Sequence, residues 1–340
     1  MNATILSNNE KHYPVLLKEI LSIISPQNGG TFIDCTFGQG GYSQSILNFS
    51  KTKVIALDRD IDCKRVAENL ERKNKKRFTF YNKKFGDIDQ INYEDLKVKG
   101  IIFDLGYSYT QIKDPKKGLS FENSGLLNMR MGINEFTASD VVNKLEQKDL
   151  ELIFKFFGDE EKSKIISKKI VLDRSRGLID TQKLVKIINS SKKNNKKIHN
   201  ATKVFQALRI FVNKEISELI YGLIKSVKIL DVNGLIVVVS FHSLEDKIIK
   251  YFFKSLSEQN KISRYYPEPV KEKKVLKIGT KKPILPSKEE IAINKPSRSA
   301  KLRYAIKIRN EKDFEKNFLK KFENLLEIEG LSRKIWKIFF

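Results

Sequence analysis

Three aspartates occupy the same kind of position in the first third of the chain. Asp34, Asp58 and Asp104 each end a short apolar run that has the composition of a buried β-strand. A single aspartate in this position usually caps the following helix. At the carboxyl ends of neighbouring parallel strands, however, three carboxylates would face the crevice in which open α/β sheets bind ligands. Carboxylates there can accept hydrogen bonds from sugar hydroxyls or from a reacting amine.

A glycine-rich turn, Gly38-Gln-Gly-Gly-Tyr-Ser43, follows the first aspartate. Glycine allows a tight turn and close approach of a ligand to the backbone, although such a turn also suits an ordinary strand-to-helix connection. Asp58 lies 20 residues beyond Gly38, and an acidic residue at the tip of the second strand binds the ribose of adenosine cofactors. The turn and Asp58 together predict an adenosine cofactor, either NAD or S-adenosylmethionine. Ser43 replaces the third glycine of dinucleotide sites, which disfavours NAD.

Two further stretches supply candidate side chains. Phe241-His-Ser-Leu-Glu-Asp246 leaves the most strand-like run of the chain and begins a helix, so His242 and Glu245 are expected at the same crevice. Either residue could instead cap that helix. Phe85 follows the third predicted strand and could stack on the base of a cofactor.

The elements that would position these residues form a Rossmann-like α/β sheet. Apolar strand-type runs alternate with amphipathic helical segments, which is typical of a parallel sheet with helices on both faces. We predict a discontinuous sheet domain over residues 1–112 and 200–310, with a helical substrate-recognition domain inserted at 113–199. Residues 311–340 are expected to form a C-terminal amphipathic helix and tail.

Three long segments have simpler patterns. The apolar spacing from Thr202 to Leu230 predicts one long amphipathic helix. Residues 257–290 are rich in lysine and punctuated by proline, which predicts a long loop. The basic polar run Ser190–Lys197 is most simply a solvated loop, and an RNA-contacting loop is the alternative.

The charge balance narrows the class of partner. The 340 residues include 65 Lys and Arg against 41 Asp and Glu, a formal net charge of +24. Such a field attracts nucleic acid first and an anionic membrane surface second, although an AT-rich genome also produces many lysines. No apolar run is long enough to span a membrane, and no secretory signal is evident. Cys35 and Cys63 are the only cysteines, so we expect no disulfide framework and a cytoplasmic protein.

A series of motifs along the chain resembles one known family. In order, they are His12-Tyr-Pro-Val-Leu-Leu, Asp34-Cys-Thr-Phe-Gly-Gln-Gly-Gly, Ala56-Leu-Asp-Arg-Asp, Asp104-Leu-Gly, Gly118-Leu-Ser-Phe, Asn128-Met-Arg-Met, Ala201-Thr-Lys-Val-Phe-Gln-Ala-Leu-Arg-Ile, Ser240-Phe-His-Ser-Leu-Glu-Asp and Arg298-Ser-Ala-Lys-Leu-Arg. Together they resemble the RsmH (MraW) family. Its members are S-adenosylmethionine-dependent enzymes of the class I methyltransferase fold that methylate N4 of a cytidine in the decoding centre of 16S rRNA. The resemblance covers residues 11–308.

The resemblance implies S-adenosylmethionine as the cofactor and small-subunit ribosomal RNA, or the 30S subunit, as the partner. It places the cofactor contacts at Gly40, Gly41, Tyr42, Asp58, Phe85, Asp104 and Gln111. The chain also departs from the family pattern. The departures are Tyr42 for a usual histidine, Tyr109-Thr110 for Ser-Pro, Lys117 for arginine, and Asn128 and Gly132 for aspartates. They leave weakened or altered activity open.

The implied chemistry is methyl transfer to an exocyclic amine. The amine of cytosine is a poor nucleophile because its lone pair is delocalised into the ring. Catalysis is therefore expected to depend on positioning and on acceptors for its N–H groups, with no metal or covalent intermediate. Asp104 is the first catalytic candidate, and His242 and Glu245 are the second. A C5 methylase would need a cysteine nucleophile, a role that neither Cys35 nor Cys63 suits.

Two other classes of function stay open at this point. An inactive RNA-binding or ribosome-assembly factor on a methyltransferase scaffold would account for the departures at Tyr42 and Tyr109. An NAD(P) dehydrogenase would share the glycine turn and Asp58 but gives no reason for the net charge of +24. The sequence does not set the oligomeric state, and a homo-oligomer is compatible with it.

Overall fold

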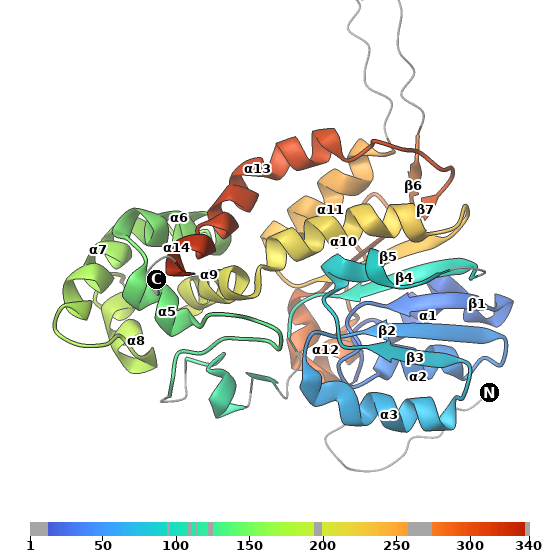
Figure 1. Cartoon of the computed structure of the whole chain (residues 1–340), viewed down its shortest axis with the longest axis horizontal. Coiled ribbons are helices and arrows are strands. Elements are labelled where there is room, and N and C mark those ends of the chain that lie inside the picture. Colours follow the sequence, from blue (N-terminus) through green and yellow to red (C-terminus); the bar gives the residue numbers. More distant parts are fainter. Residues whose placement is uncertain are drawn as a thin grey trace, which may run out of the picture.

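The computed structural model describes residues 13–93, 96–107, 111–112, 114–121, 125–193, 199–257 and 274–336. In these ranges a seven-stranded sheet has the order β3-β2-β1-β4-β5-β7-β6 (Figure 1). The strands are β1 Gly30–Asp34, β2 Thr52–Leu57, β3 Phe78–Tyr81, β4 Val98–Asp104, β5 Leu235–Ser240, β6 Leu276–Ile278 and β7 Lys301–Lys307. Strands β1 to β5 are parallel, whereas β7 runs antiparallel to both β5 and β6. The predicted Rossmann-like α/β fold is confirmed.

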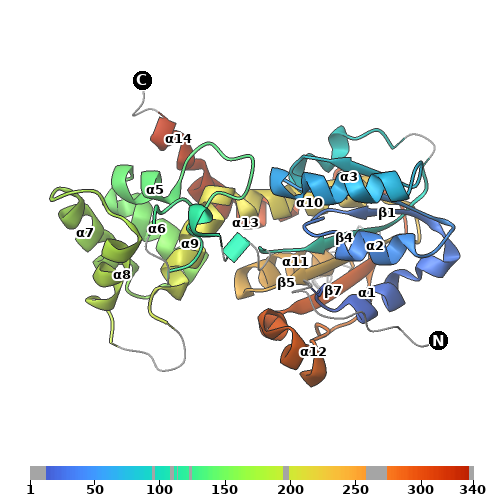
Figure 2. The ribbon, with the colours of Figure 1, turned by 90° about the horizontal axis from the view of Figure 1, so that it is seen from below.

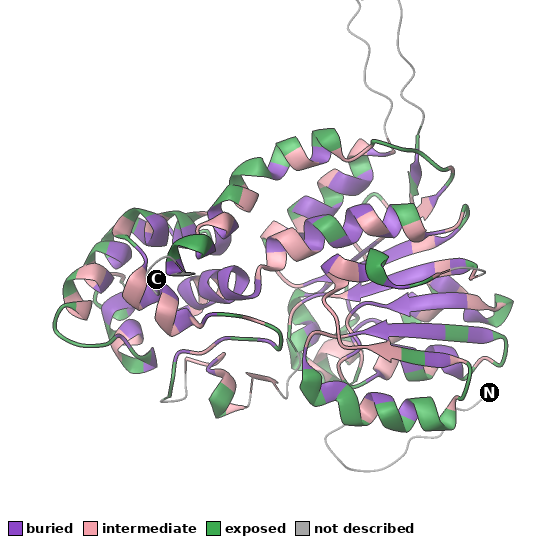
Figure 3. Ribbon diagram, viewed as in Figure 1, coloured by how far each residue is buried: buried purple, intermediate pink, exposed green. Residues whose placement is uncertain are grey.

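The central strands are buried on both faces of the sheet. In β4, Ile101 and Phe103 belong to one buried cluster and Ile102 to another on the opposite face. Figure 3 shows the central strands as almost continuously buried. Burial on both faces explains why these strands have unbroken apolar runs in place of the alternation of a half-exposed strand.

Helices cover the two faces of the sheet. Those that share the cluster of Ile102 are α1 Leu17–Ile24, α2 Gly41–Leu47 and α3 Lys64–Lys73. Helices α10 Glu215–Ile229 and α11 Ser243–Ser255 are among those that share the cluster of Phe103. The parallel strands therefore lie between two layers of helices, and their carboxyl ends meet at one edge of the sheet. Among the described residues, no helix combines the length and the apolar character that crossing a membrane requires.

The helical insertion follows β4 and lies beside the sheet domain (Figure 1). Its helices are α5 Ala138–Lys144, α6 Gln147–Gly158, α7 Ser163–Arg174, α8 Thr181–Asn189 and α9 Thr202–Asn213. Helix α9 packs closely on α6: a Cβ on Gly158 would lie 2.3 Å from the Lys203 carbonyl oxygen, so glycine permits this approach. The packing therefore joins α9 to the insertion, and the domain limits of 113–199 stay a prediction.

The single long helix predicted for Thr202–Leu230 is wrong. Two helices, α9 and α10, are separated by Lys214, which adopts the left-handed conformation (φ 50°, ψ 42°) that ends α-helices. Apolar residues keep a helical spacing on both sides of Lys214, so the periodicity does not reveal the break. The break places Glu215 of α10 next to Arg209 of α9, and the two side chains form an ion pair.

The long loop predicted for residues 257–290 is wrong in part. It contains the edge strand β6 and the start of α12 Lys288–Ile293. A three-residue strand is too short to give a periodic signal. Several predicted features lie outside the described residues, namely His12, Tyr109-Thr110, residues 194–198 of the basic run and residues 258–273.

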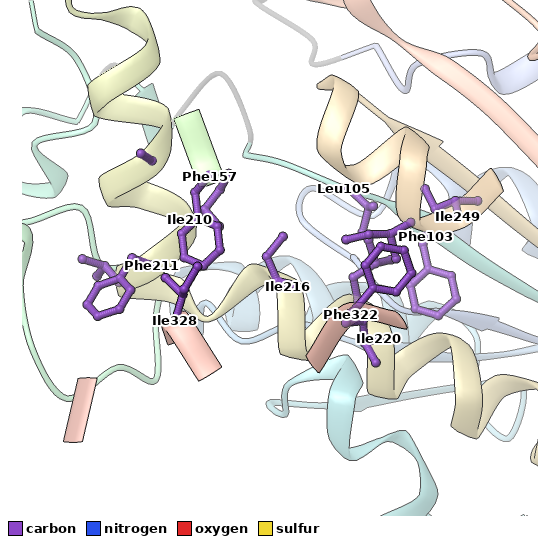
Figure 4. Close-up of a cluster of buried hydrophobic side chains, with 14 of the residues drawn as sticks. Phe103, Leu105, Phe157, Ile210, Phe211, Ile216, Ile220, Ile249, Phe322 and Ile328 are labelled. Atoms are coloured by element: carbon purple, nitrogen blue, oxygen red, sulfur yellow. The ribbon is translucent and has the colours of Figure 1, made fainter. Parts of the chain in front are cut away.

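The C-terminal segment runs from the sheet domain to the insertion (Figures 1 and 2). It forms α13 Lys316–Gly330 and α14 Ser332–Trp336. Phe318 packs on α11, with its ring centre 4.6 Å from that of Phe252 and the two rings tilted by 55°. At the other end, Lys334 Nζ pairs with Asp149 of α6 at 2.8 Å. Figure 4 shows the buried side chains between the two parts, with Ile216 of α10 lying between those of the insertion and those of the sheet domain.

Candidate active site

Asp34 organises the turn that follows β1. Its carboxylate is fully buried and accepts hydrogen bonds from the Ser43 hydroxyl (2.6 Å) and the Thr36 amide (3.3 Å). Burial raises the pKa of Asp34 to about 6. Asp34 thus fixes the turn to the first turn of α2, and the expectation that its carboxylate faces the ligand crevice is wrong.

The three glycines of this turn have different roles. Gly40 (φ +75°) and Gly41 are required by packing, because a Cβ would lie 2.9 Å from the Phe37 ring or 2.1 Å from Pro14 Cγ respectively. Gly38 (φ +50°) is open, since a Cβ there would meet no atom closer than 3.9 Å. The backbone is therefore most accessible to a ligand at Gly38. The predicted cofactor contacts of Gly40 and Gly41 stay predictions.

Asp58 follows β2 and borders a cavity of about 220 Å³. Its carboxylate accepts the amides of Gly38 (2.7 Å) and Asp60 (2.8 Å), which hold it at the cavity wall. Burial raises the pKa of Asp58, and these two N–H donors partly offset the effect. The cavity is lined by Gly38, Gln39, Asp58, Asp60, Asp62, Cys63, Gln111, Asp114 and Lys117. Carboxylates beside an open glycine backbone suit the hydroxyls of a ribose.

A polar cluster ties two walls of this cavity together. Gln111 Nε2 donates to Asp60 Oδ2 at 2.6 Å, and Lys117 pairs with both Asp60 and Asp62, the latter at 2.8 Å. Although burial acts to raise the pKa of Asp60, hydrogen bonds from Lys117 and Gln111 hold it below its ordinary value. These bonds join the segment after β4 to the segment after β2. Gln111, one of the predicted cofactor contacts, lines the cavity.

Phe85 does not line this cavity. Its half-buried ring packs edge-on against Phe103, with ring centres 5.3 Å apart. The ring also lies against α10, because a Cβ on Gly222 would be 2.8 Å from it. The structure gives Phe85 a packing role between β4 and α10, and its stacking on a cofactor base stays a prediction.

Tyr42 connects the glycine turn to Asp104, the carboxylate at the end of β4. The buried Tyr42 hydroxyl contacts the Val15 carbonyl oxygen and lies 3.2 Å from Asp104 Oδ2. A phenol has one proton, and a carbonyl oxygen can only accept. When Tyr42 donates to Val15, its contact with Asp104 requires a protonated carboxyl that donates to the phenol oxygen. Two predicted site residues, Tyr42 and Asp104, are thus brought into direct contact.

Asp104 combines a raised pKa with an unused acceptor. Its amide donates to Thr36 Oγ1 at 2.8 Å, whereas its Oδ1 is buried with no hydrogen-bond partner among the described residues. Burial, together with the charges of Asp34 and Glu245, raises the pKa of Asp104 to about 8 despite the contact with Tyr42. Buried polar atoms without partners are rare. We therefore infer that Oδ1 is reserved for a donor that arrives with a ligand.

His242 and Glu245 form the N-terminal cap of α11. His242 Nδ1 accepts the Glu245 amide at 3.4 Å, and Glu245 Oε2 accepts the amides of Phe241 (2.9 Å) and His242 (3.3 Å). These reciprocal bonds make a capping box, so both residues have the helix-capping role that the sequence left open as the alternative to a catalytic one. Although burial acts to raise the pKa of Glu245, His242 and Arg209 hold it below its ordinary value. Glu245 therefore adds negative potential beside Asp104, and the catalytic roles of His242 and Glu245 stay predictions.

Three residues that the sequence did not single out extend this network. The buried Arg209 side chain makes two hydrogen bonds with the Glu215 carboxylate, at 2.9 and 2.8 Å. Its guanidinium lies 4.7 Å from the centre of the Tyr107 ring, and its charge interacts with that of Glu245. The sequence contained one signal for this network, an arginine among the apolar residues of the helix Thr202–Asn213. A buried charge needs a partner of opposite charge, so Arg209 could have been expected to pair with a nearby carboxylate.

Three side chains of this network offer ligand atoms that could surround a cation. Those of Glu215, His242 and Glu245 lie within 4.8 Å of one another. A divalent cation would have to compete with Arg209 for Glu215 and would be repelled by its guanidinium. The set is better described as an ion-pair network around Arg209.

The chain is similar to known proteins over most of its length. A family model described as the MraW methylase family matches residues 9–308. A Rickettsia bellii protein named ribosomal RNA small subunit methyltransferase H is 43% identical over 304 residues, which cover 88% of this chain and 99% of its own. A Rickettsia massiliae protein of the same name is 42% identical over 301 residues, with coverages of 87% and 98%. A solved rRNA methylase structure from Streptococcus thermophilus has 10% identity, coverages of 85% and 96%, and a TM-score of 0.37, which is too low to support an argument.

Proposed function

The chain belongs to the MraW methylase family, and on this premise we propose that it methylates the N4 amine of a cytidine in small-subunit ribosomal RNA, with S-adenosylmethionine as the methyl donor. The observation that carries the N4 assignment is Oδ1 of Asp104, at the carboxyl end of β4, which has no hydrogen-bond partner among the described residues. An exocyclic amine has the N–H donors that this acceptor lacks. The proposed partner is the small ribosomal subunit, and the proposed location is the cytoplasm.

The cavity at Asp58 supports a cationic cofactor over a dinucleotide. Four aspartates and one lysine line it, so its walls carry an excess of negative charge. The pyrophosphate of NAD would be repelled there, and a dinucleotide site instead directs backbone N–H groups at that pyrophosphate. S-adenosylmethionine supplies a methyl group already activated by the sulfonium charge. Asp58 would hold its ribose, and Gln111 and Lys117 would keep the cavity walls in place.

Asp104 holds the amine in the proposed reaction. Its Oδ1 accepts one N–H of the amine and so restricts the orientation of the nucleophilic nitrogen. As the new N–C bond forms and the S–C bond breaks, the nitrogen gains a positive charge and then loses one proton. Ionised Asp104 is the acceptor for this proton, and its raised pKa makes it a stronger base than an ordinary aspartate. While Asp104 is ionised, the single proton of the Tyr42 hydroxyl is donated to the other oxygen of the same carboxylate and not to the Val15 carbonyl oxygen.

The two cysteines support N4 over C5 as the target atom. Methylation at C5 of cytosine needs a cysteine thiolate that attacks the ring. Cys35 and Cys63 are both buried, and burial raises the pKa of each thiol above its ordinary value. A buried thiol held in its neutral form is a poor nucleophile.

Three residues that depart from the family pattern make specific contacts in the structure, and these contacts weigh against an inactive scaffold. Tyr42 contacts Asp104, and Lys117 joins the two cavity walls. Gly132 (φ +76°) lies so close to Arg59 that a Cβ would be 1.9 Å from its carbonyl oxygen. These three replacements therefore fit their local surroundings, which supports a functional site over an inactive scaffold.

Substitution of Asp104 tests the proposed function. Purified small subunits that lack the modification would be incubated with the protein and methyl-labelled S-adenosylmethionine. We expect Asp104→Asn to lower kcat by about 10²- to 10⁴-fold, the usual contribution of a positioned proton acceptor. Asp159→Asn is the matched control, because the Asp159 side chain is 93% exposed in the insertion. Wild-type activity in Asp104→Ala would contradict the proposal.

A further inference from the structure

Tyr107 presents an aromatic ring at the mouth of the crevice. It lies three residues after Asp104, beyond the carboxyl end of β4, and 43% of it is exposed. The Arg209 guanidinium covers one face of the ring at 4.7 Å from its centre. Because one ring face is covered and the residue still keeps this exposure, the described residues leave the other face of the ring accessible.

The support behind the ring is rigid. Arg209 donates two hydrogen bonds to the Glu215 carboxylate, and the two side chains are only 9% and 12% exposed. The attraction of a guanidinium to an aromatic face fixes the plane of the Tyr107 ring. The left-handed Lys214 between α9 and α10 brings Glu215 into reach of Arg209. The local fold therefore holds the exposed ring in one orientation.

The same network reaches the proposed catalytic carboxylate. The charge of Glu245 interacts with that of Arg209 and with that of Asp104. Gly106 lies beside the Phe241 ring, where a Cβ would be 3.4 Å from it, so the segments that follow β4 and β5 are packed side by side. Tyr107, Arg209 and Asp104 thus belong to one neighbourhood.

We propose that the free face of Tyr107 is the platform on which the target cytosine stacks while its amine lies at Asp104. This inference rests on the proposed function. A base must leave its stack in the RNA before its exocyclic amine can enter a pocket, and its flat face then needs a new stacking partner. Arg209 is the positioning residue that holds the platform. Stacking on an aromatic side chain contributes about 1–3 kcal/mol per base, which is about 5- to 150-fold in affinity.

Replacement of the ring in steps tests this platform. The full-length protein and its variants would methylate small ribosomal subunits under steady-state conditions. Tyr107→Phe keeps the ring and should stay within about twofold of the wild-type kcat/KM. Tyr107→Leu keeps apolar bulk without a π face, and it should lower kcat/KM by about 5- to 150-fold, as should Tyr107→Ala. The Kd for S-adenosylmethionine should not change, because the ring lies outside the cofactor cavity.

Tyr221→Ala is the matched control, because Tyr221 on α10 is also 43% exposed. It should keep wild-type kcat/KM. Wild-type activity in Tyr107→Leu and Tyr107→Ala would overturn the platform while leaving the proposed function intact. Equal losses in Tyr107→Phe and Tyr107→Ala would also overturn it, because the ring would then not be the active feature. If the wild type itself formed no N4-methylcytidine, the proposed function and the platform would both fail.

Discussion

Glu329 in the C-terminal helix is the sharpest test of how the site is supported. It is 3% exposed, and its two oxygens accept the amides of Ile216 (2.8 Å) and Ser217 (2.9 Å) in the first turn of α10. Those amides have no partner within their own helix. Glu329 lies outside the residues matched by the family model, yet it caps the helix that begins with Glu215, the partner of Arg209.

Glu329→Ala should destabilise the protein by about 2 kcal/mol. Each amide left without an acceptor costs about 1–3 kcal/mol, and removal of a buried carboxyl group offsets part of this loss. Burial raises the pKa of Glu329 from 4.5 to about 7, so the folded protein holds this proton more tightly than the unfolded chain. The contribution of Glu329 is then greatest below pH 4.5 and is lost as the pH rises through 7. The penalty of the substitution should therefore be larger at pH 5.5 than at pH 8.

Urea denaturation followed by circular dichroism at the two pH values would measure this effect. Glu327→Ala is the matched control, since Glu327 is exposed in the same helix, and it should change the free energy of unfolding by less than about 0.5 kcal/mol. An equally small change in Glu329→Ala would refute the capping role. A penalty that grew with pH would refute the reasoning about its proton.

Three further predictions follow from the site and the core. Asp58→Ala should weaken S-adenosylmethionine binding by about 10-fold or more in titration calorimetry, because a carboxylate acceptor for the ribose is lost; an unchanged Kd would count against the cavity at Asp58. The affinity for this cationic cofactor should rise as the pH increases through about 8, because Asp104 then becomes negatively charged. Asp104→Asn should abolish this pH dependence, and a wild-type Kd that does not change with pH would contradict the prediction. Phe318→Ala should lower the free energy of unfolding by about 3–5 kcal/mol, against less than about 0.5 kcal/mol for the exposed Lys320→Ala; similar losses in both would refute the packing of α13 on α11.

The sheet could be predicted because its signals are local. An apolar run such as Gly100–Asp104 is buried on both faces, and few other structures give that pattern. The break at Lys214 could not be predicted, since lysine has no preference for the left-handed conformation and no glycine or proline marks the position. Strand β6 was missed because three residues carry no periodicity, and its place at the sheet edge depends on pairing with β7.

The candidate site could be predicted only in part, because a residue's position on a strand does not determine its contacts. Asp34 and Asp104 each end a parallel strand. The Ser43 hydroxyl donates a hydrogen bond to the Asp34 carboxylate, whereas Oδ1 of Asp104 has no hydrogen-bond partner among the described residues. The contact of Tyr42 with Asp104 joins residues that are 62 positions apart. The pairing of Arg209 with Tyr107 likewise needs the helix break and the packing of two chain segments.

The proposed reaction is methylation at N4 of a cytidine in small-subunit ribosomal RNA. The most direct measurement is mass analysis of the nucleosides released from small subunits after incubation with the protein and methyl-labelled S-adenosylmethionine. We expect the label in N4-methylcytidine, and we expect Asp104→Asn to reduce it strongly. Label in 5-methylcytidine, or no label in any cytidine, would show that N4 is not the target atom.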